Sequence, residues 1–347
     1  MYIKKIVLFI VALTIVAGGI FSYYVYNTIL GANTDFSSNS IALNISKKDS
    51  PQDVLKKLKP FIKDIKSFDW LAKKKAYYSY IKPGHYILKK GDSNNDIITT
   101  LRSKNTPIKI SFNNQERIEN LAGRIAQQID ADSLELLTSF KNKQFLSKNN
   151  FTHATALSMY IPNSYEFFWN TSADGFRNRM LTEYNYFWNT SRKAKAKKIG
   201  LSPNEVYTLA SIVHKETVKI DERPRVAGVY MNRLIKGIKL DADPTVIYTI
   251  KKSTNDWDRL IKRVLFKDLK LKHPYNTYQN KGLPPGPIAM PDISAINAVL
   301  NYEKHDYYYF VADIKNIGYH KFATSLKQHN RNSKNYHNWV NKQGILR

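Results

Sequence analysis

The stretch SPNEVYTLASIVHKET, residues 202–217, predicts a helix that carries a carboxylate on its buried face. Its start is clear, because Ser202 is suited to cap the helix and Pro203 fits the first helical position. Glu205 completes a capping box with Ser202. We therefore expect a helix that begins at Pro203 and runs to the end of this stretch.

The apolar positions of this helix share one stripe with a glutamate, at spacings of three and four residues: Val206, Leu209, Val213 and Glu216. A carboxyl group against apolar surface loses solvation of its charged form, so its pKa rises. A raised pKa suits a general acid near neutral pH. The alternative is a glutamate at the end of the stripe that reaches solvent or pairs with Arg223 or Arg225.

His214, in the same helix, has no second histidine at His-x-x-x-His spacing. It lies two residues from Glu216 and so on a different helix face. We interpret it as a surface histidine. Because the chain also has no cysteine, disulfides, thiolate metal sites and cysteine nucleophiles are excluded, and we expect neither a metal nor a cofactor.

The N-terminus predicts a membrane anchor. Residues 6–26 form an uncharged, apolar run that is long enough to span a bilayer and ends in interfacial tyrosines. Lys4 and Lys5 precede the run, whereas residues 27–46 contain no Lys or Arg, which favours a cytoplasmic segment 1–5 and an exported body. We expect a single-pass protein of the inner (plasma) membrane, with a cleaved signal peptide as the alternative.

The remaining chain predicts an α+β protein with two folded parts. Residues 27–40 are small and polar and are interpreted as a linker. Residues 41–110 contain a strand–helix–strand–helix pattern that resembles the LysM-like carbohydrate-binding domain. Residues 111–347 are expected to form a larger, mixed α/β catalytic domain.

The chain carries 54 Lys and Arg against 28 Asp and Glu, a net charge of +26. Such a charge indicates anionic partners, although a Lys-rich composition with solvated side chains explains it equally well. An exported body meets no chromosome and no nucleic-acid motif is present, so we expect no nucleic-acid partner.

Seven ordered blocks of the sequence resemble the YceG/MltG family of endolytic peptidoglycan transglycosylases. They are IPNSYEFFWNTS (161–172), LASIVHKET (209–217), DERPRVAGVYMNRL (221–234), GIKLDADPTVIYTI (237–250), YNTYQNKGLPPGPIAMPDISAINAVL (275–300), YYYFVAD (307–313) and GYHKFATSLKQHN (318–330). The strand-like YYYFVAD is expected beside the helix that carries Glu216. The family often has Glu at the position of His214, and this departure puts activity in question.

The resemblance implies a lytic cut between N-acetylmuramic acid and N-acetylglucosamine, with Glu216 as the single acid and base. Glu216 would protonate the glycosidic oxygen and then take the proton of the muramic C6 hydroxyl, which closes a 1,6-anhydro ring. Hydrolysis with retention or inversion needs two carboxylates, whereas the lytic route needs one. The resemblance also implies action on nascent strands, termination of their elongation and, by analogy, peptidoglycan synthases as partners.

Other residues in these blocks are candidates for contact with the glycan, through amides, hydroxyls, charges or stacking rings: Asn163, Tyr165, Asn232, Arg233, Asp243, Thr245, Asn276, Tyr278 and His320. For each of them a structural role, such as turn formation or core packing, is the alternative.

Two other functions remain open. A muramidase-type hydrolase would use a second carboxylate, for which Asp243 is the candidate. A non-catalytic, membrane-anchored wall-binding protein would need only the positive charge and the LysM-like part, and His214 keeps this hypothesis open.

Overall fold

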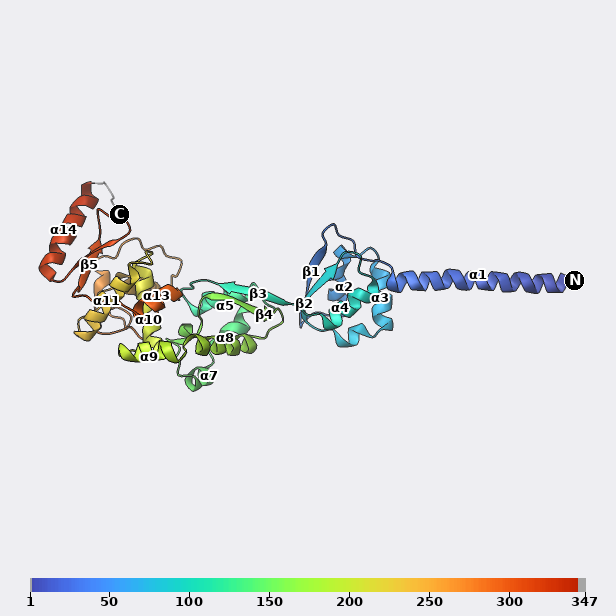
Figure 1. Ribbon diagram of the computed structural model, residues 1–347, viewed down its shortest axis with the longest axis horizontal. Helices are drawn as coiled ribbons and strands as arrows, with labels where there is room; N and C mark the ends of the chain where they lie inside the picture. Colours follow the sequence, from blue (N-terminus) through green and yellow to red (C-terminus); the bar gives the residue numbers. More distant parts are fainter. Residues whose placement is uncertain (1, 343–347) are drawn as a thin grey trace. The chain divides into compact units, whose positions relative to one another are not determined.

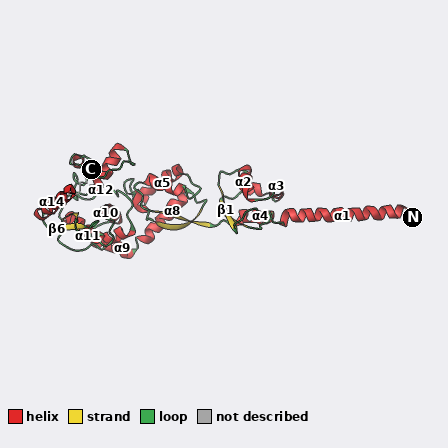
Figure 2. Ribbon diagram, turned by 90° about the horizontal axis from the view of Figure 1, so that it is seen from above, coloured by secondary structure: helices red, strands yellow, loops and turns green. Residues whose placement is uncertain are grey.

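The computed structural model describes residues 2–342 and divides the chain into two compact units. Unit 1 comprises residues 1–110, 128–131 and 165–172, and unit 2 comprises residues 111–127, 132–164 and 173–347. Both units combine helices with a few short strands, which pair into two-stranded sheets (Figures 1 and 2). The predicted α+β class is therefore confirmed.

Unit 1 begins with one long helix, followed by a small mixed body. Its elements are α1 (Tyr2–Leu30), β1 (Ser40–Ile45), α2 (Pro51–Leu58), η1 (Lys59–Phe61), α3 (Ile65–Lys74), η2 (Tyr77–Tyr80), β2 (Gly84–Lys89), α4 (Asn94–Ser103) and β3 (Pro107–Phe112). Strands β1 and β2 are antiparallel, with Ser40 opposite Lys89 and Ile45 opposite Gly84. Strand β3 pairs with β4 (Asn163–Phe168), and the boundary between the units runs through both strands.

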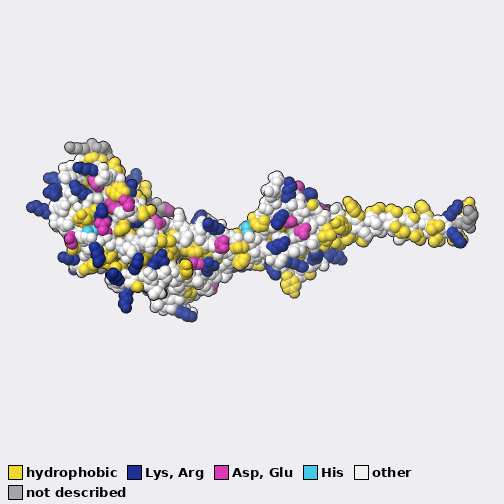
Figure 3. All heavy atoms as spheres, in the orientation of Figure 1, with side chains coloured by type: hydrophobic (Ala, Val, Ile, Leu, Met, Phe, Trp, Pro, Cys, Tyr) yellow, Lys and Arg dark blue, Asp and Glu magenta, His cyan; other side chains and the backbone are white. Residues whose placement is uncertain are grey.

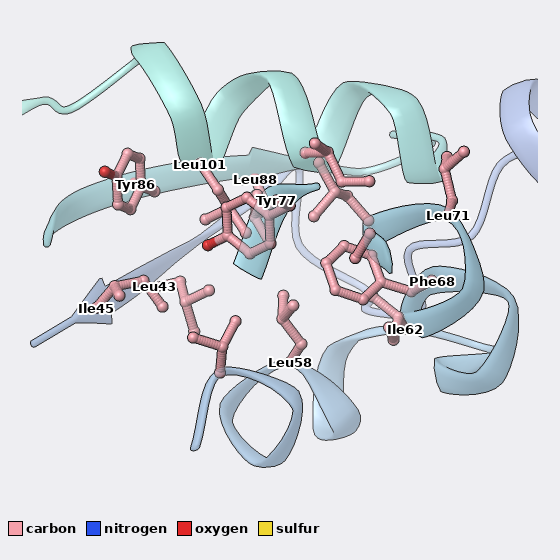
Figure 4. Packing of buried hydrophobic residues seen from close by; sticks show 14 residues of the cluster. Leu43, Ile45, Leu58, Ile62, Phe68, Leu71, Tyr77, Tyr86, Leu88 and Leu101 are labelled. Atoms are coloured by element: carbon pink, nitrogen blue, oxygen red, sulfur yellow. The ribbon is translucent and has the colours of Figure 1, made fainter. Parts of the chain in front are cut away.

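The sheet and helices of unit 1 enclose one hydrophobic core (Figure 4). Leu43 and Ile45 point from β1 into the core because alternate residues of a strand share a face. Phe68 and Leu71 of α3 reach it from the other side at a spacing of three. Burial of each such side chain contributes roughly 1.5–3 kcal/mol, which holds this small body together.

Helix α1 is apolar along most of its length (Figure 3). Lys4 and Lys5 stand in its first turn. Among residues 2–342 it is the helix long and apolar enough to cross a membrane. The structure corrects the linker expected at residues 27–40. Residues 27–30 continue the helix, while Asn33 and Thr34 are only 6% and 4% exposed and pair with the body of unit 1. Polar composition suggested a solvated tether, but the side chains of Asn33 and Thr34 are buried and hydrogen-bonded, whereas residues 37–40 are exposed.

Unit 2 is mainly helical. Its elements are α5 (Ile118–Ala126), α6 (Ser133–Phe140), α7 (Lys143–Lys148), η3 (Ala156–Met159), α8 (Ala173–Phe187), α9 (Thr190–Lys198), α10 (Pro203–Glu216), α11 (Arg223–Ile235), α12 (Asp243–Thr254), η4 (Asp268–Lys270), α13 (Ile293–Leu300), β5 (Tyr309–Ala312), β6 (His320–Ala323) and α14 (Leu326–Lys342).

Helix α10 is the central helix of unit 2. It starts as predicted, with Ser202 as N-cap and Glu205 completing the capping box. The buried surface is wider than the predicted stripe, since every residue from Val206 to Val213 is buried, beneath α11, α12 and α13. The polar residue Ser211 is accommodated because its hydroxyl donates to Thr208 O and accepts from the main chain of Ile288.

Strands β5 and β6 form an antiparallel hairpin, with Tyr309 opposite Ala323 and Ala312 opposite His320. The predicted strand YYYFVAD corresponds to β5. Helix α14 packs on both strands of the hairpin. The hairpin and α14 thereby bring residues beyond position 300 to the end of α10.

Candidate active site

A cavity of about 470 Å³ opens in unit 2 at the C-terminal end of α10. Helices α10, α11, α12 and α14 and strands β5 and β6 all contribute to its wall. The polar and titratable groups that line it are Glu216, Tyr230, Arg233, Asp241, Asp243, Tyr278, Tyr308, Tyr309, His320, His329 and Asn330.

Glu216 is the last residue of α10 and is half-buried in this wall. The hydroxyl of Tyr230, from α11, donates to Glu216 Oε1 at 2.5 Å. Tyr230 is buried, and its ring packs edge-on against Phe310 of β5. One carboxylate oxygen is therefore fixed by a rigid phenol, and Oε2 has no hydrogen-bond partner within residues 2–342.

The pKa of Glu216 is raised from 4.5 to about 7, chiefly by burial. The hydrogen bond from Tyr230 lowers the pKa, the charge of Asp243 raises it, and His320 lowers it slightly. The rise expected from the apolar stripe is thus present. Near neutral pH the group populates both forms, so it can give a proton and take one back.

Asp243 and Tyr278 form a second tyrosine–carboxylate pair in the cavity. Asp243 is the first residue of α12, and Tyr278 donates its hydroxyl proton to Asp243 Oδ1 at 2.7 Å. Burial raises the pKa of Asp243, although the bond from Tyr278 opposes the rise. A second carboxylate therefore shares the cavity with Glu216.

His320 is held by Glu222 through both its main chain and its ring. The amide N–H of His320 donates to Glu222 Oε1 at 2.6 Å, and Nδ1 lies 2.9 Å from Oε2. Glu222 is buried, which raises its pKa, but the hydrogen bonds of His320 more than offset this and lower it. Because an ionised carboxylate only accepts hydrogen bonds, Nδ1 carries a proton and Nε2 is left for the cavity.

Arg233 lines the cavity, but its guanidinium group forms hydrogen bonds within unit 2. Its guanidinium donates to Asp241 Oδ2 and to three main-chain oxygens, those of Tyr308, Lys239 and Leu240. It is only 7% exposed. These bonds hold the cavity wall together, and the contact of Arg233 with the glycan stays a prediction.

Three other candidate residues are engaged away from the cavity. Asn232 donates to the main chain at His305 and Tyr307. Thr245 and Asn276 are fully buried, and their side chains bond to nearby loops at Ala242, Thr277, Leu269 and Leu271. None of the three is among the residues that line the cavity, so their contact with the glycan stays a prediction.

Asn163 and Tyr165 lie on β4 and are not among the residues that line the cavity. Asn163 is exposed, whereas Tyr165 is buried and belongs to unit 1. Of the nine candidate contact residues, the cavity therefore gathers Arg233, Asp243, Tyr278 and His320 around Glu216.

His214 is outside the cavity lining, and its side chain is only 16% exposed. Its Nδ1 lies 3.2 Å from Asp292 Oδ2 and 3.3 Å from a guanidinium nitrogen of Arg223. Burial, together with the charge of Arg223, lowers the pKa of His214 despite Asp292. The surface histidine expected from the sequence is instead part of a partly buried polar network. Within residues 2–342 no three His, Asp or Glu side chains cluster as a metal would require.

Sequence reasoning missed three groups at the site: Tyr230, Glu222 and His329. Tyr230 and Glu222 stand in the DERPRVAGVYMNRL block, but nothing in its spacing shows which side chains face Glu216. His329, in the last block, stacks on Tyr309 in the cavity wall, with centroids 5.3 Å apart.

The sequence pattern of the YceG-like family matches residues 43–335, most of the chain and the whole of this cavity. The chain belongs to the YceG-like family. The cavity at Glu216 therefore lies within the matched region. Two named relatives are similar to this chain over most of its length.

The chain is 30% identical to the endolytic murein transglycosylase of Bacillus subtilis, over 93% of this chain and 91% of that protein. It is 27% identical to the endolytic murein transglycosylase of Streptococcus pneumoniae, and the match covers 91% of this chain but 62% of that protein. The crystal structure of a YceG-like protein from Listeria monocytogenes superimposes with a TM-score of 0.57 at 25% identity. That match covers 85% of this chain and 99% of the other.

Proposed function

We propose that this YceG-like chain is a membrane-anchored endolytic murein transglycosylase that cuts the bond between N-acetylmuramic acid and N-acetylglucosamine. The observation that carries the proposal is the Glu216 carboxyl group, which has a pKa of about 7 and lines a cavity. The names of the relatives from Bacillus subtilis and Streptococcus pneumoniae support the same activity.

In the proposed reaction, protonated Glu216 gives its proton to the glycosidic oxygen as the bond to the muramic C1 breaks. The resulting carboxylate takes the proton of the muramic C6 hydroxyl, whose oxygen attacks C1 and closes the 1,6-anhydro ring. Glu216 returns to its protonated form, and no water is consumed. The hydrogen bond from Tyr230 favours the carboxylate stage and burial favours the acid, so neither form is trapped.

A muramidase-type hydrolase is the second candidate, and the position of Asp243 favours it. This carboxylate lines the same cavity, as hydrolysis with two carboxylates would require. Its hydrogen bond from Tyr278 stabilises the ionised form, which suits a base that activates water. The products distinguish the two reactions.

We also propose how the rest of the chain serves this activity. Residues 6–26 span the inner (plasma) membrane with residues 1–5 in the cytoplasm, as the lysines before the span favour. Residues 41–110 act as a LysM-like glycan-binding domain, for which the antiparallel pair of strands flanked by helices is suited. Cleavage next to the membrane would end the elongation of nascent strands and place peptidoglycan synthases nearby.

The test is to incubate the detergent-solubilised full chain, and a Glu216→Gln variant, with uncrosslinked glycan strands and to identify the new ends by mass spectrometry. We expect 1,6-anhydromuramic ends that disappear in the variant. Ordinary reducing ends would establish the hydrolase and call for Asp243→Asn next. Binding without cleavage would leave a wall-binding protein and overturn the enzymatic proposal.

A further inference from the structure

The end of α1 is fixed to the body of unit 1 by side-chain contacts. Asn94, the first residue of α4, donates through Nδ2 to Thr28 O at 2.8 Å and to Ser67 Oγ of α3 at 3.0 Å. Ile29 packs against the core of unit 1, and Asn33 donates to the main chain at Asp64. The first turns of α3 and α4 therefore contact the last turn of α1.

The length of α1 sets where this joint lies. The helix has 29 residues, which at 1.5 Å per residue gives about 43 Å. A bilayer with its headgroups is about 40–45 Å thick. With Lys4 and Lys5 in one headgroup layer, Thr28 reaches the other. The body of unit 1 thus starts at the membrane surface itself.

Helix α3 lies beside the end of α1 (Figure 1). The ammonium group of Lys63, just before α3, lies 3.5 Å from Ala32 O at the end of α1. Lys66 is exposed in the first turn, and Trp70, 43% exposed, follows four residues later on the same face. Lysines are attracted to anionic headgroups and tryptophan favours the interface between lipid and water.

Neither of the acidic residues near this face, Asp64 and Asp69, forms an ion pair with Lys63 or Lys66 within residues 2–342. Asp64 is used as the N-cap, where it accepts from the amides of Lys66 and Ser67. Asp69 is paired with Lys73 at 2.6 Å and accepts from Tyr78. The ammonium groups of Lys63 and Lys66 have no acidic partner among the described residues.

We propose that this face of α3, defined by Lys63, Lys66 and Trp70, is a lipid-binding surface that rests on anionic phospholipid headgroups of the membrane that α1 spans. The inference rests on the proposed anchoring but not on the enzymatic activity. Its consequence is that unit 1 is oriented on the bilayer by contact as well as by attachment.

Because the chain has no cysteine, single cysteines can be labelled in the full-length protein, reconstituted in nanodiscs of phosphatidylcholine with or without phosphatidylglycerol. A polarity-sensitive fluorophore is placed at Lys66→Cys or Trp70→Cys. The matched control is Lys104→Cys, an exposed position at the other end of α4, about 15 Å along the helix from Asn94. Figure 2 shows α4 lying beyond the end of α1. A label at Ala12→Cys reports whether α1 is in lipid.

We expect headgroup-attached quenchers to quench positions 66 and 70, more strongly with phosphatidylglycerol, and to leave position 104 unaffected. Reversing the charge with Lys63→Glu and Lys66→Glu should reduce quenching at position 70, whereas Lys104→Glu should not. Equal quenching at 66, 70 and 104 while Ala12 is in lipid would overturn this inference alone. Equal quenching of position 66 in both lipid mixtures would overturn the preference for anionic lipid. If position 12 is in water, the anchoring itself has failed, whatever the glycan products show.

Discussion

The phenol of Tyr230 donates a hydrogen bond of 2.5 Å to Oε1 of Glu216, in a wall where the carboxyl pKa is about 7. Two opposing effects meet in this pair. Burial favours the neutral acid, while the phenol favours the carboxylate. Their balance sets the pH range in which the group can both give and take a proton.

Removing the Tyr230 hydroxyl should therefore move the pH profile of glycan cleavage. Activity is expected to fall as the pH rises above about 7, because Glu216 must start protonated. In Tyr230→Phe the carboxylate loses a hydrogen bond, so its pKa rises and the alkaline limb moves up by about one unit. The measurement is initial rate against pH for both proteins.

Tyr207 offers the matched control, since it is buried on α10 but donates to Tyr160 O, away from the cavity. Tyr207→Phe should lower the stability of the protein and leave the alkaline limb of the pH profile unchanged. A downward shift in Tyr230→Phe would contradict the assigned direction of the hydrogen bond.

Glu216→Gln should change how stability depends on pH. The carboxyl pKa is raised from 4.5 to about 7 in the folded chain, so the folded state binds this proton more tightly than the unfolded state does. Wild-type stability is therefore lost as the pH rises from 4.5 to about 7, by roughly 1–3 kcal/mol for a half-buried group. Glutamine cannot ionise, so the variant should unfold at a higher temperature than wild type at about pH 8 and show little difference at about pH 4.5. Calorimetry at both pH values measures this, and a stabilisation that is larger at the lower pH would refute the assignment.

Two substitutions of His320 should distinguish the roles of its two ring nitrogens, Nδ1 and Nε2. Asparagine places its amide near Nδ1 and keeps the bond to Glu222, whereas glutamine reaches the place of Nε2. If Nε2 serves the substrate, His320→Asn should lose roughly 10- to 100-fold in kcat/KM and His320→Gln should lose less. A greater loss in His320→Gln would show that the bond to Glu222 matters more than Nε2.

Glu222→Gln tests the pair of Glu222 and His320 by changing its carboxylate. The main-chain N–H and Nδ1 of His320 face different oxygens of Glu222. In glutamine one of these oxygens becomes an NH2 group, which only donates, so one of the two hydrogen bonds is lost. We expect a lower kcat with a shifted pH profile, and partial recovery in Glu222→Asp. An unchanged kcat with only a lower melting temperature would limit Glu222 to a structural role.

Gly228 in α11 should not tolerate a side chain. A Cβ there would lie 2.3 Å from Glu303 O and 2.6 Å from His305 Nε2, so the backbone beyond α13 would have to move. Gly228→Ala is expected to destabilise the chain by about 1–3 kcal/mol. Gly123 in α5 has no atom within 4 Å of its Cβ position, and Gly123→Ala should stabilise by about 0.5–1 kcal/mol. Chemical unfolding of both variants measures the contrast.

Local patterns in the sequence sufficed for the start of α10, the place of Glu216 beside core residues and the apolar span, because capping, helical spacing and hydrophobicity act over a few residues. The hydrogen-bonded pair of Glu222 and His320 could not be predicted from the sequence. The two residues are 98 positions apart, and only the folded hairpin brings them together. Asn276 and Asn33 show that a polar residue in a loop is not always exposed. Both are polar residues next to turn-forming sequence, and composition does not reveal that their amides are buried and bonded to the main chain.

The wall of the cavity comes from parts of the chain made at different times. Glu216 and Tyr230 are synthesised well before His320 and His329, which close the cavity from β6 and α14. If α1 is inserted first, as its place at the N-terminus allows, most of the chain has crossed the membrane before the cavity is complete. If α1 spans the membrane as proposed, the order of residues would delay the assembled site until the C-terminal part of the chain has also crossed. A product that stops before β5 would keep α1 and Glu216 but lack the parts of the cavity wall that β5, β6 and α14 supply.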